Sequence, residues 1–172
     1  MLSESDCHTL SPAVRLNILN VLANASGSVG LAGGQVLDLN MILQDPTLET
    51  LAAMHRCKTG ALIEAAVLMG GLCATDDSAT LACLKSYAQP LGLAFQVIDD
   101  VLDGTGDTDT LGKPAGADQE RGQPTFLSIL GEAPARQYAE ELKDQAIDAL
   151  GDLEMDTALL VDLAQFTVSR CH

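Results

Sequence analysis

One stretch of the chain, ALIEAAVLMGGL at residues 61–72, would be apolar on almost every face of a helix. Glu64 is its only charged side chain. A helix with this pattern is buried among other helices, because a surface helix carries a polar face. The stretch lies within the longest helical candidate, residues 47–74. The sequence therefore predicts a helical bundle with this segment in its interior.

The rest of the chain is also helical in pattern, with no run that alternates between apolar and polar residues as a strand does. Aromatic residues make up only 3% of the chain, which favours helices over sheets. Ser11 and Pro12 suit the start of a first helix, and Pro90 predicts a kink in a later one. We predict an all-α fold in which residues 1–172 form a single domain, with residues 1–10 frayed.

Composition excludes several classes of function. The formal charge is −15, with nine Lys and Arg residues, so nucleic-acid binding is excluded because it needs a basic face. The longest uncharged run near the middle, residues 65–75, is too short to span a membrane. Five cysteines without a CxxC pair indicate reduced thiols, and the polar, acidic N-terminus is not typical of a signal peptide. We therefore expect a cytoplasmic protein.

The segment FQVIDDVLDGTGD, at residues 95–107, places Asp99, Asp100 and Asp103 within one apolar run. On a helix these carboxylates can reach one patch, where like charges and a nearby helix C-terminus make them unfavourable. Such breaches of local rules tend to mark functional sites, and oxygen-only ligands suit a hard cation such as Mg²⁺. The alternative is a solvated acidic helix end.

Magnesium held by few carboxylates completes its shell with water and phosphate oxygens, so cations that could bind a phosphate are informative. Lys58 lies in HRCKTG, directly before the apolar run, and Lys113 lies in the polar, glycine-rich loop at residues 104–124. A surface lysine is the alternative for each, but lysines are scarce in this chain. Thr59 and Gln96 are neutral hydrogen-bonding candidates on the same predicted helices.

Four segments occur in an order and spacing similar to those of bacterial farnesyl diphosphate synthases: GGQVLDL, HRCKTGALIEAAV, LGLAFQVIDDVLDGTGD and TLGKPAGADQERGQPTF. The chain resembles this family of trans-prenyltransferases from about Ser11 to its C-terminus. The resemblance implies an isoprenoid synthase bundle around a central cavity. It also implies condensation of isopentenyl diphosphate with dimethylallyl or geranyl diphosphate through an Mg²⁺-assisted allylic carbocation, giving farnesyl diphosphate.

The resemblance assigns roles to individual residues. Asp99, Asp100 and Asp103 match the second aspartate-rich motif and would hold Mg²⁺. Lys58, Lys113 and Asp99 would be the catalytic residues, with both lysines on the leaving diphosphate. The other substrate-binding residues that it implies are Thr59, Gln96, Gln35 and Asp38.

Two departures from the family affect these expectations. The family has an upstream half with the first aspartate-rich motif, whereas only ten residues precede SPAVRL here. We therefore expect a partial, C-terminal bundle with little or no activity alone, and exposed apolar helices that drive a homodimer or higher oligomer. Gln123 also stands where the family usually has a lysine, which predicts weaker diphosphate binding there.

Other interpretations stay open. A class I terpene cyclase shares the bundle, but its second metal motif typically mixes Asn, Ser or Thr with Glu, whereas this chain has DDxxD with KTG and GK. A longer-chain synthase of the geranylgeranyl type is not distinguished. Outside catalysis, the chain could be a half-bundle subunit that pairs with another chain, or a structural bundle with an incidental acidic end.

Overall fold

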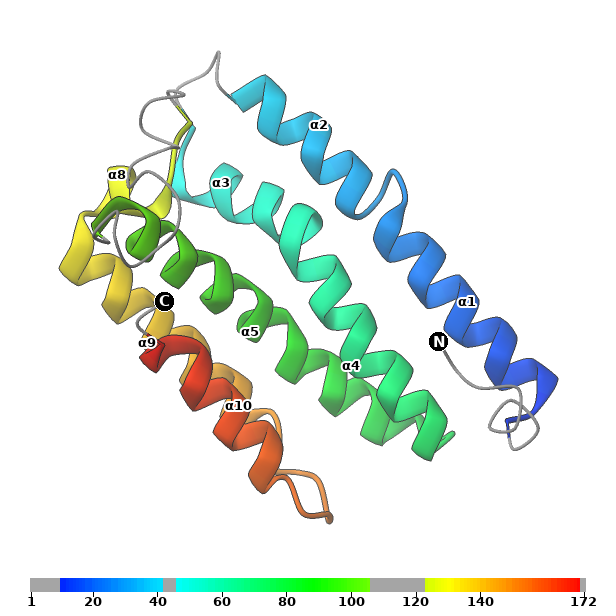
Figure 1. Ribbon diagram of the computed structural model, residues 1–172. Coiled ribbons are helices and arrows are strands. Elements are labelled where there is room, and N and C mark those ends of the chain that lie inside the picture. Colours follow the sequence, from blue (N-terminus) through cyan, green and yellow to red (C-terminus); the bar gives the residue numbers. More distant parts are fainter. Residues whose placement is uncertain (1–9, 42–45, 106–122, 171–172) are drawn as a thin grey trace.

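Figure 1 shows the computed structural model, which describes residues 10–41, 46–105 and 123–170. The elements in these ranges are α1 (Pro12–Ser26), α2 (Leu31–Met41), α3 (Leu48–His55), the π-helical turn η2 (Arg56–Gly60), α4 (Ala61–Ala74), α5 (Ser78–Thr105), α8 (Phe126–Leu130), α9 (Glu132–Asp148) and α10 (Ala158–Ser169). The described residues contain no strand. The predicted all-α class is confirmed. The predicted fraying of residues 1–10 concerns residues that, apart from Leu10, lie outside the described ranges.

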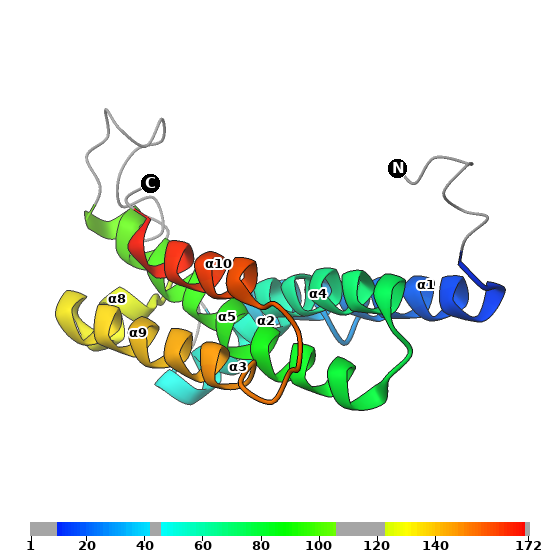
Figure 2. The ribbon, with the colours of Figure 1, turned by 90° about the horizontal axis from the view of Figure 1, so that it is seen from below.

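The long helices lie side by side in Figure 1, in the order α1–α2, α3–α4, α5 and α9. Helix α5 occupies the centre, since it contacts η2 and α4 on one side and α9 and α10 on the other. Its helical backbone continues through Pro90. Figure 2 shows α10 above α9, where it contacts both α9 and α5.

Short polar side chains fix several helix starts. The Ser11 hydroxyl accepts the Val14 backbone N–H at 3.2 Å, and the Thr47 hydroxyl accepts that of Thr50 at 3.3 Å. Each bond satisfies one of the N–H groups that have no acceptor in the first turn of a helix. Ser11 is thus the N-cap that the sequence predicted.

Two apolar clusters hold the helices together. The first joins α3, α5, α8 and α9 around Leu51, Met54, Val97 and Phe126, and the second joins α5, α9 and α10 around Tyr87. The Tyr87 hydroxyl donates to the Leu160 carbonyl at 2.8 Å, which satisfies the polar end of this buried side chain. Burial raises the pKa of Tyr87 to about 12.

Helix α4 is less buried than the sequence predicted. Ala65 is its only buried residue, and most of the others are half-buried. The reason is the layered arrangement: α1 and α5 pack against two sides of α4, and the described residues leave its remaining face uncovered. The prediction of a fully interior helix is therefore wrong for the described chain.

The continuous helix Leu48–Ala74 is, among the described residues, the one helix long and apolar enough to cross a membrane. Only 11% of its apolar window is buried. Length and composition are weak evidence for a membrane span, because bundle helices pass the same test. Lys58 and Glu64 on this helix form ion pairs with Asp38 of α2 and Lys85 of α5. We therefore assign it to the bundle.

Candidate functional site

The KTG segment lies in the π-helical turn η2, Arg56–Gly60, between α3 and α4. A π turn inserts one extra residue into a helix, and such turns are frequent at functional sites. Here it lets neighbouring side chains reach opposite partners: Lys58 contacts Asp38 of α2, and Thr59 contacts Gln96 of α5. Sequence reasoning predicted an ordinary α-helix at this position, because its apolar spacing does not distinguish the two.

Glycines allow η2 to approach its neighbours closely. A Cβ atom on Gly34 of α2 would lie 2.3 Å from the backbone nitrogen of Lys58. A Cβ atom on Gly92 of α5 would lie 2.9 Å from the Cα atom of Gly60. Both distances are below van der Waals contact, so the position of Lys58 depends on the absence of these side chains.

Lys58 and Asp38 form a partly buried ion pair. The Lys58 Nζ atom donates to Asp38 Oδ2 at 2.7 Å, and the Gln123 side-chain amide donates to the same oxygen at 3.2 Å. The Asp38 side chain is only 7% exposed, whereas Lys58 is 29% exposed. The carboxylate is therefore enclosed and fixes the lysine, while the ammonium group remains accessible to an anionic ligand.

A chain of hydrogen bonds runs from Thr59 to the start of α8. The Thr59 hydroxyl donates to Gln96 Oε1 at 2.7 Å, and Gln96 Nε2 donates to Asp100 Oδ1 at 2.8 Å. The other oxygen of Asp100 accepts the Phe126 backbone N–H at 2.8 Å. Asp100 is buried, so its carboxylate is committed to protein donors on both oxygens.

Asp99 and Asp103 have different environments from Asp100. The Asp99 side chain is 55% exposed, and its Oδ1 atom lies 3.5 Å from Arg170 Nη2. Asp103 is half-buried, one helical turn further along α5. Of the three predicted carboxylates, these two remain open to an external cation.

Among the described residues, Asp99, Asp103 and Gln35 are not brought into the hydrogen bonds on Asp38 and Asp100. Gln35 is exposed on α2, next to Gly34. Lys113 lies outside the described residues, as does most of the loop at 104–124. Gln123, which sequence reasoning singled out only as a departure from the family, does join the pair of Lys58 and Asp38 through its bond to Asp38.

The remaining donor set fits a magnesium ion only in part. In the portion of the chain that the structure describes, no three His, Cys, Asp or Glu side chains form a metal-binding group. Magnesium is often bound through one or two carboxylates, with water and phosphate oxygens completing its shell. Asp99 and Asp103 fit that mode, whereas a complete protein cage is not present in the described ranges.

His55 is a buried, titratable neighbour of the site that sequence reasoning missed. Its ring lies 5.5 Å from that of Phe126, and neither ring nitrogen has a hydrogen-bond partner among the described residues. Burial, with a smaller effect of the Lys58 cation, lowers the pKa of His55 to about 4, although Asp38 acts in the opposite direction. At neutral pH this imidazole is therefore uncharged.

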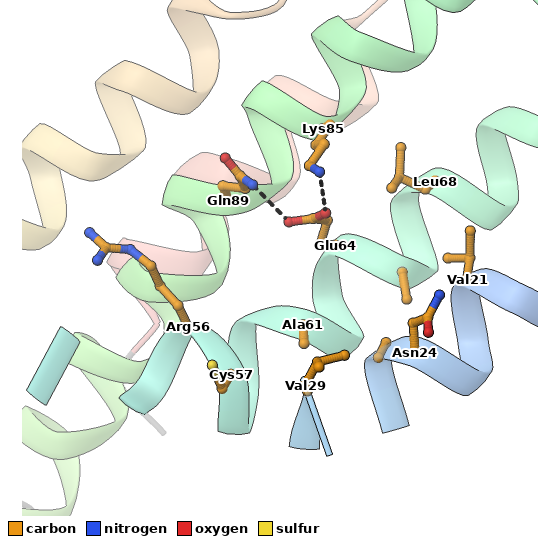
Figure 3. Close-up of a pocket in the computed structure, with 13 residues that line it drawn as sticks. Val21, Asn24, Val29, Arg56, Cys57, Ala61, Glu64, Leu68, Lys85 and Gln89 are labelled. Atoms are coloured by element: carbon orange, nitrogen blue, oxygen red, sulfur yellow. Dashed lines mark hydrogen bonds and ion pairs between the residues drawn. The ribbon is translucent and has the colours of Figure 1, made fainter. Parts of the chain in front are cut away.

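A cavity of about 460 Å³ lies between α1, η2, α4 and α5, and Figure 3 shows the side chains that line it. Glu64 projects into it and accepts a hydrogen bond from Gln89 at 3.0 Å, with Lys85 at 3.4 Å. None of the predicted site residues lines this cavity. Arg56 and Cys57 of η2 do line it, so the cavity borders the turn that carries Lys58 without including Lys58 itself.

Known protein sequences match this chain over most of its length. Residues 4–156 match the polyprenyl synthetase family. The chain is 44% identical to farnesyl diphosphate synthase of Escherichia coli, over 99% of the chain and 58% of that protein. The chain thus spans little more than half the length of this curated relative.

Solved structures have the same helical arrangement. Geranylgeranyl pyrophosphate synthetase of Pyrococcus horikoshii matches with a TM-score of 0.81 and 29% identity, over 94% of this chain and 61% of that one. A geranyltransferase of Helicobacter pylori, solved with magnesium and isoprenyl diphosphate, matches with a TM-score of 0.79 and 29% identity, over 92% and 52% of the two chains.

Proposed function

The chain belongs to the polyprenyl synthetase family, and from this premise we propose that it serves in trans-prenyl transfer of the farnesyl diphosphate synthase type. The substrates would be isopentenyl diphosphate and an allylic diphosphate, dimethylallyl or geranyl. The observation that carries the proposal is that side chains from α2, η2, α5 and Gln123 form two hydrogen-bonded groups, one on Asp38 and one on Asp100. The η2 members of the two groups, Lys58 and Thr59, are adjacent in sequence. The first group contains a partly exposed cation, Lys58, and the exposed Asp99 directly precedes Asp100 of the second group.

We assign the residues different roles. Lys58, held by Asp38, would bind the leaving diphosphate, and Thr59 and Gln96 would line the allylic site. Asp99 and Asp103 would hold Mg²⁺, while Asp100 would tie α5 to α8 rather than bind metal directly. Lys113, Gln35 and Asp38 keep the substrate-side roles that the resemblance implies, of which Asp38 acts through Lys58.

Magnesium, when bound, would neutralise the charge that develops on the diphosphate as it leaves. The protein's own contribution is to place donors where that charge develops and to keep water away. Lys58 is fixed before substrate arrives, so little reorganisation is needed. Apolar helix walls around the site would provide the dry surroundings that a carbocation requires.

Calorimetry with Mg²⁺ and inorganic pyrophosphate tests this site directly. We expect pyrophosphate to bind only with Mg²⁺ present, and Asp99→Asn to weaken binding by at least about tenfold, or ~1.4 kcal/mol. Asp148→Asn, an exposed carboxylate of α9, is the matched control and should bind normally. The same affinity in Asp99→Asn and Asp148→Asn would refute the proposed site.

Product analysis after incubation with isopentenyl and geranyl diphosphates tests the reaction. We keep the prediction that this chain alone turns over little or not at all, and that an added N-terminal half of a relative restores activity. Turnover at an enzymatic rate by the chain alone would contradict it. A longer product is the second candidate, because the chain shares its fold with a geranylgeranyl pyrophosphate synthetase.

We further propose a cytoplasmic location. Cys57, Cys73 and Cys83 are free thiols. Free thiols are typical of a reducing compartment. Fractionation of the native host would test this, and recovery of the protein in an oxidising compartment would contradict it.

A further inference from the structure

The C-terminal end of α10 reaches the carboxylate motif through Arg170. The Arg170 side chain is only 13% exposed and contacts Phe95 and Asp99, which lie one turn apart on α5. Its Nη2 atom donates to the Phe95 carbonyl oxygen at 2.9 Å and lies 3.5 Å from Asp99 Oδ1. The guanidinium carbon is 4.1 Å from the centroid of the Phe95 ring. One residue thus joins the end of the chain to the first aspartate of DDxxD.

The contacts of the Arg170 guanidinium indicate whether Asp99 fixes the arginine or the arginine fixes Asp99. The short hydrogen bond goes to a neutral carbonyl, and the aromatic contact is also neutral, so neither requires the Asp99 charge. The ion pair to Asp99, at 3.5 Å, is longer than the hydrogen bond that the same nitrogen makes to the carbonyl oxygen, at 2.9 Å. The guanidinium is therefore anchored on Phe95, and Asp99 is the partner whose orientation it can fix.

We propose that Arg170 is a positioning residue for Asp99, which orients this carboxylate toward a divalent cation bound with diphosphate. The inference rests on the proposed function, since it assumes that Asp99 binds the cation. An arginine suits the role because it stays charged and its planar fork holds a fixed direction. Neighbours that orient a metal ligand usually affect metal affinity by ten- to a hundredfold.

Arg170 could also have the opposite effect on metal affinity. A cation beside a ligand could compete with the metal for the carboxylate, in which case its removal would tighten metal binding. The anchoring on Phe95 argues against competition, because the guanidinium does not need Asp99 to stay in place. The direction of the change in affinity therefore decides between positioning and competition.

Calorimetric titration of Mn²⁺ in the presence of inorganic pyrophosphate measures this direction. We expect Arg170→Met to weaken Mn²⁺ binding by about ten- to a hundredfold, and Arg170→Lys to recover only part of it. In an Asp99→Asn background, Arg170→Met should cause no further loss. Arg136→Met is the matched control, since Arg136 pairs with Glu132 on the exposed side of α9. It should leave Mn²⁺ affinity unchanged.

Three outcomes would overturn the inference: unchanged Mn²⁺ affinity in Arg170→Met, tighter Mn²⁺ binding in Arg170→Met, or an equal loss of affinity in the wild-type and Asp99→Asn backgrounds.

A wild-type chain that binds no Mn²⁺ with pyrophosphate would instead refute the proposed function. In that case a double-mutant cycle on the metal-free chain, with Arg170→Met and Asp99→Asn, still tests the contact. The two changes should shift the denaturation midpoint non-additively, and additive shifts would show that Arg170 does not act on Asp99.

Discussion

The two adjacent aspartates of α5 have different environments in the structure, although nothing in the sequence distinguishes them. Asp100 accepts hydrogen bonds from Gln96 and from the Phe126 backbone, whereas Asp99 is 55% exposed. Asp100→Ala should destabilise the chain by about 1–3 kcal/mol, because it leaves buried donors without an acceptor. Asp99→Ala should cost clearly less. Urea denaturation of both variants checks this, and equal midpoints would contradict the division of roles.

His55 gives the chain a predictable response to acid. Its pKa is lowered to about 4 in the folded state, against 6.5 for an exposed imidazole. Between these values the unfolded chain binds a proton that the folded chain does not, so stability falls as pH is lowered from 6.5 toward 4. The loss should total on the order of 3 kcal/mol.

His55→Leu provides the comparison for this pH effect. It removes the titrating group, so its stability should fall less steeply than wild type between pH 6.5 and 4, whatever its stability at neutral pH. Denaturation midpoints across that range measure the difference. Parallel pH profiles for the two proteins would show that His55 does not titrate as proposed.

The side chain of residue 123 lies where a cation could bind an anionic ligand directly. Its amide lies 3.2 Å from the Asp38 oxygen that also holds Lys58. Gln123→Lys should add a second positive charge to the network and tighten Mg²⁺–pyrophosphate binding by about 1 kcal/mol, less at high salt. Gln145→Lys on the exposed surface of α9 adds the same charge elsewhere and should have no such effect. Unchanged binding in Gln123→Lys would place Gln123 outside the anion site.

At the scale of elements, the close approach of α2 and η2 depends on Gly34. A Cβ atom there would lie 2.3 Å from the Lys58 nitrogen, so Gly34→Ala must push the two elements apart. We expect a loss of about 1–3 kcal/mol in stability and weaker pyrophosphate binding. Thermal denaturation and calorimetry measure the two effects.

Gly70 supplies the matched control for this substitution. It lies within α4, and a Cβ atom there would meet no atom within 4 Å. Gly70→Ala should therefore stabilise the chain by about 0.5–1 kcal/mol through helix propensity alone. If Gly34→Ala were also neutral or stabilising, the close packing of α2 on η2 would not be what fixes Lys58.

The helices themselves could be predicted from the sequence, because their spacing and caps are local signals. Ser11 and Pro12 start α1 as predicted, and α5 extends over the segment that contains Asp99. The π turn at Lys58 could not be predicted, since it results from packing against α2 and α5 rather than from local propensity. The exposure of α4 also depends on which neighbours are present.

At the scale of the whole molecule, the candidate site depends on contacts between distant positions. Asp38 meets Gln123 across 85 positions of the sequence, and Phe95 meets Arg170 across 75. Periodicity carries no information about such pairs. The resemblance brought Lys58, Thr59, Gln96 and the aspartates together by analogy, but Arg170 and His55 had no sequence signal of this kind. Their roles follow only from the fold.

The surface of α1 and α2 carries large apolar side chains in contact with solvent. Leu16 and Leu19 on α1 are 59% and 62% exposed, and Val36 and Leu39 on α2 are 58% and 57% exposed. Large apolar patches of this kind usually mark an interaction surface. The homodimer or higher oligomer stays a prediction, and we propose that α1 and α2 would form its contact.

Light scattering after size exclusion tests self-association of the chain. We expect a dimer or larger species for wild type, and a shift toward monomer for the double variant Leu19→Gln and Val36→Gln, because polar side chains remove the gain from burying this face. Leu159→Gln on α10 is the control, since Leu159 is 82% exposed but lies on a different helix. A wild-type chain that elutes as a monomer at every concentration would contradict self-association. A dimer that Leu159→Gln disrupts, and the α1–α2 variant does not, would move the interface to α10.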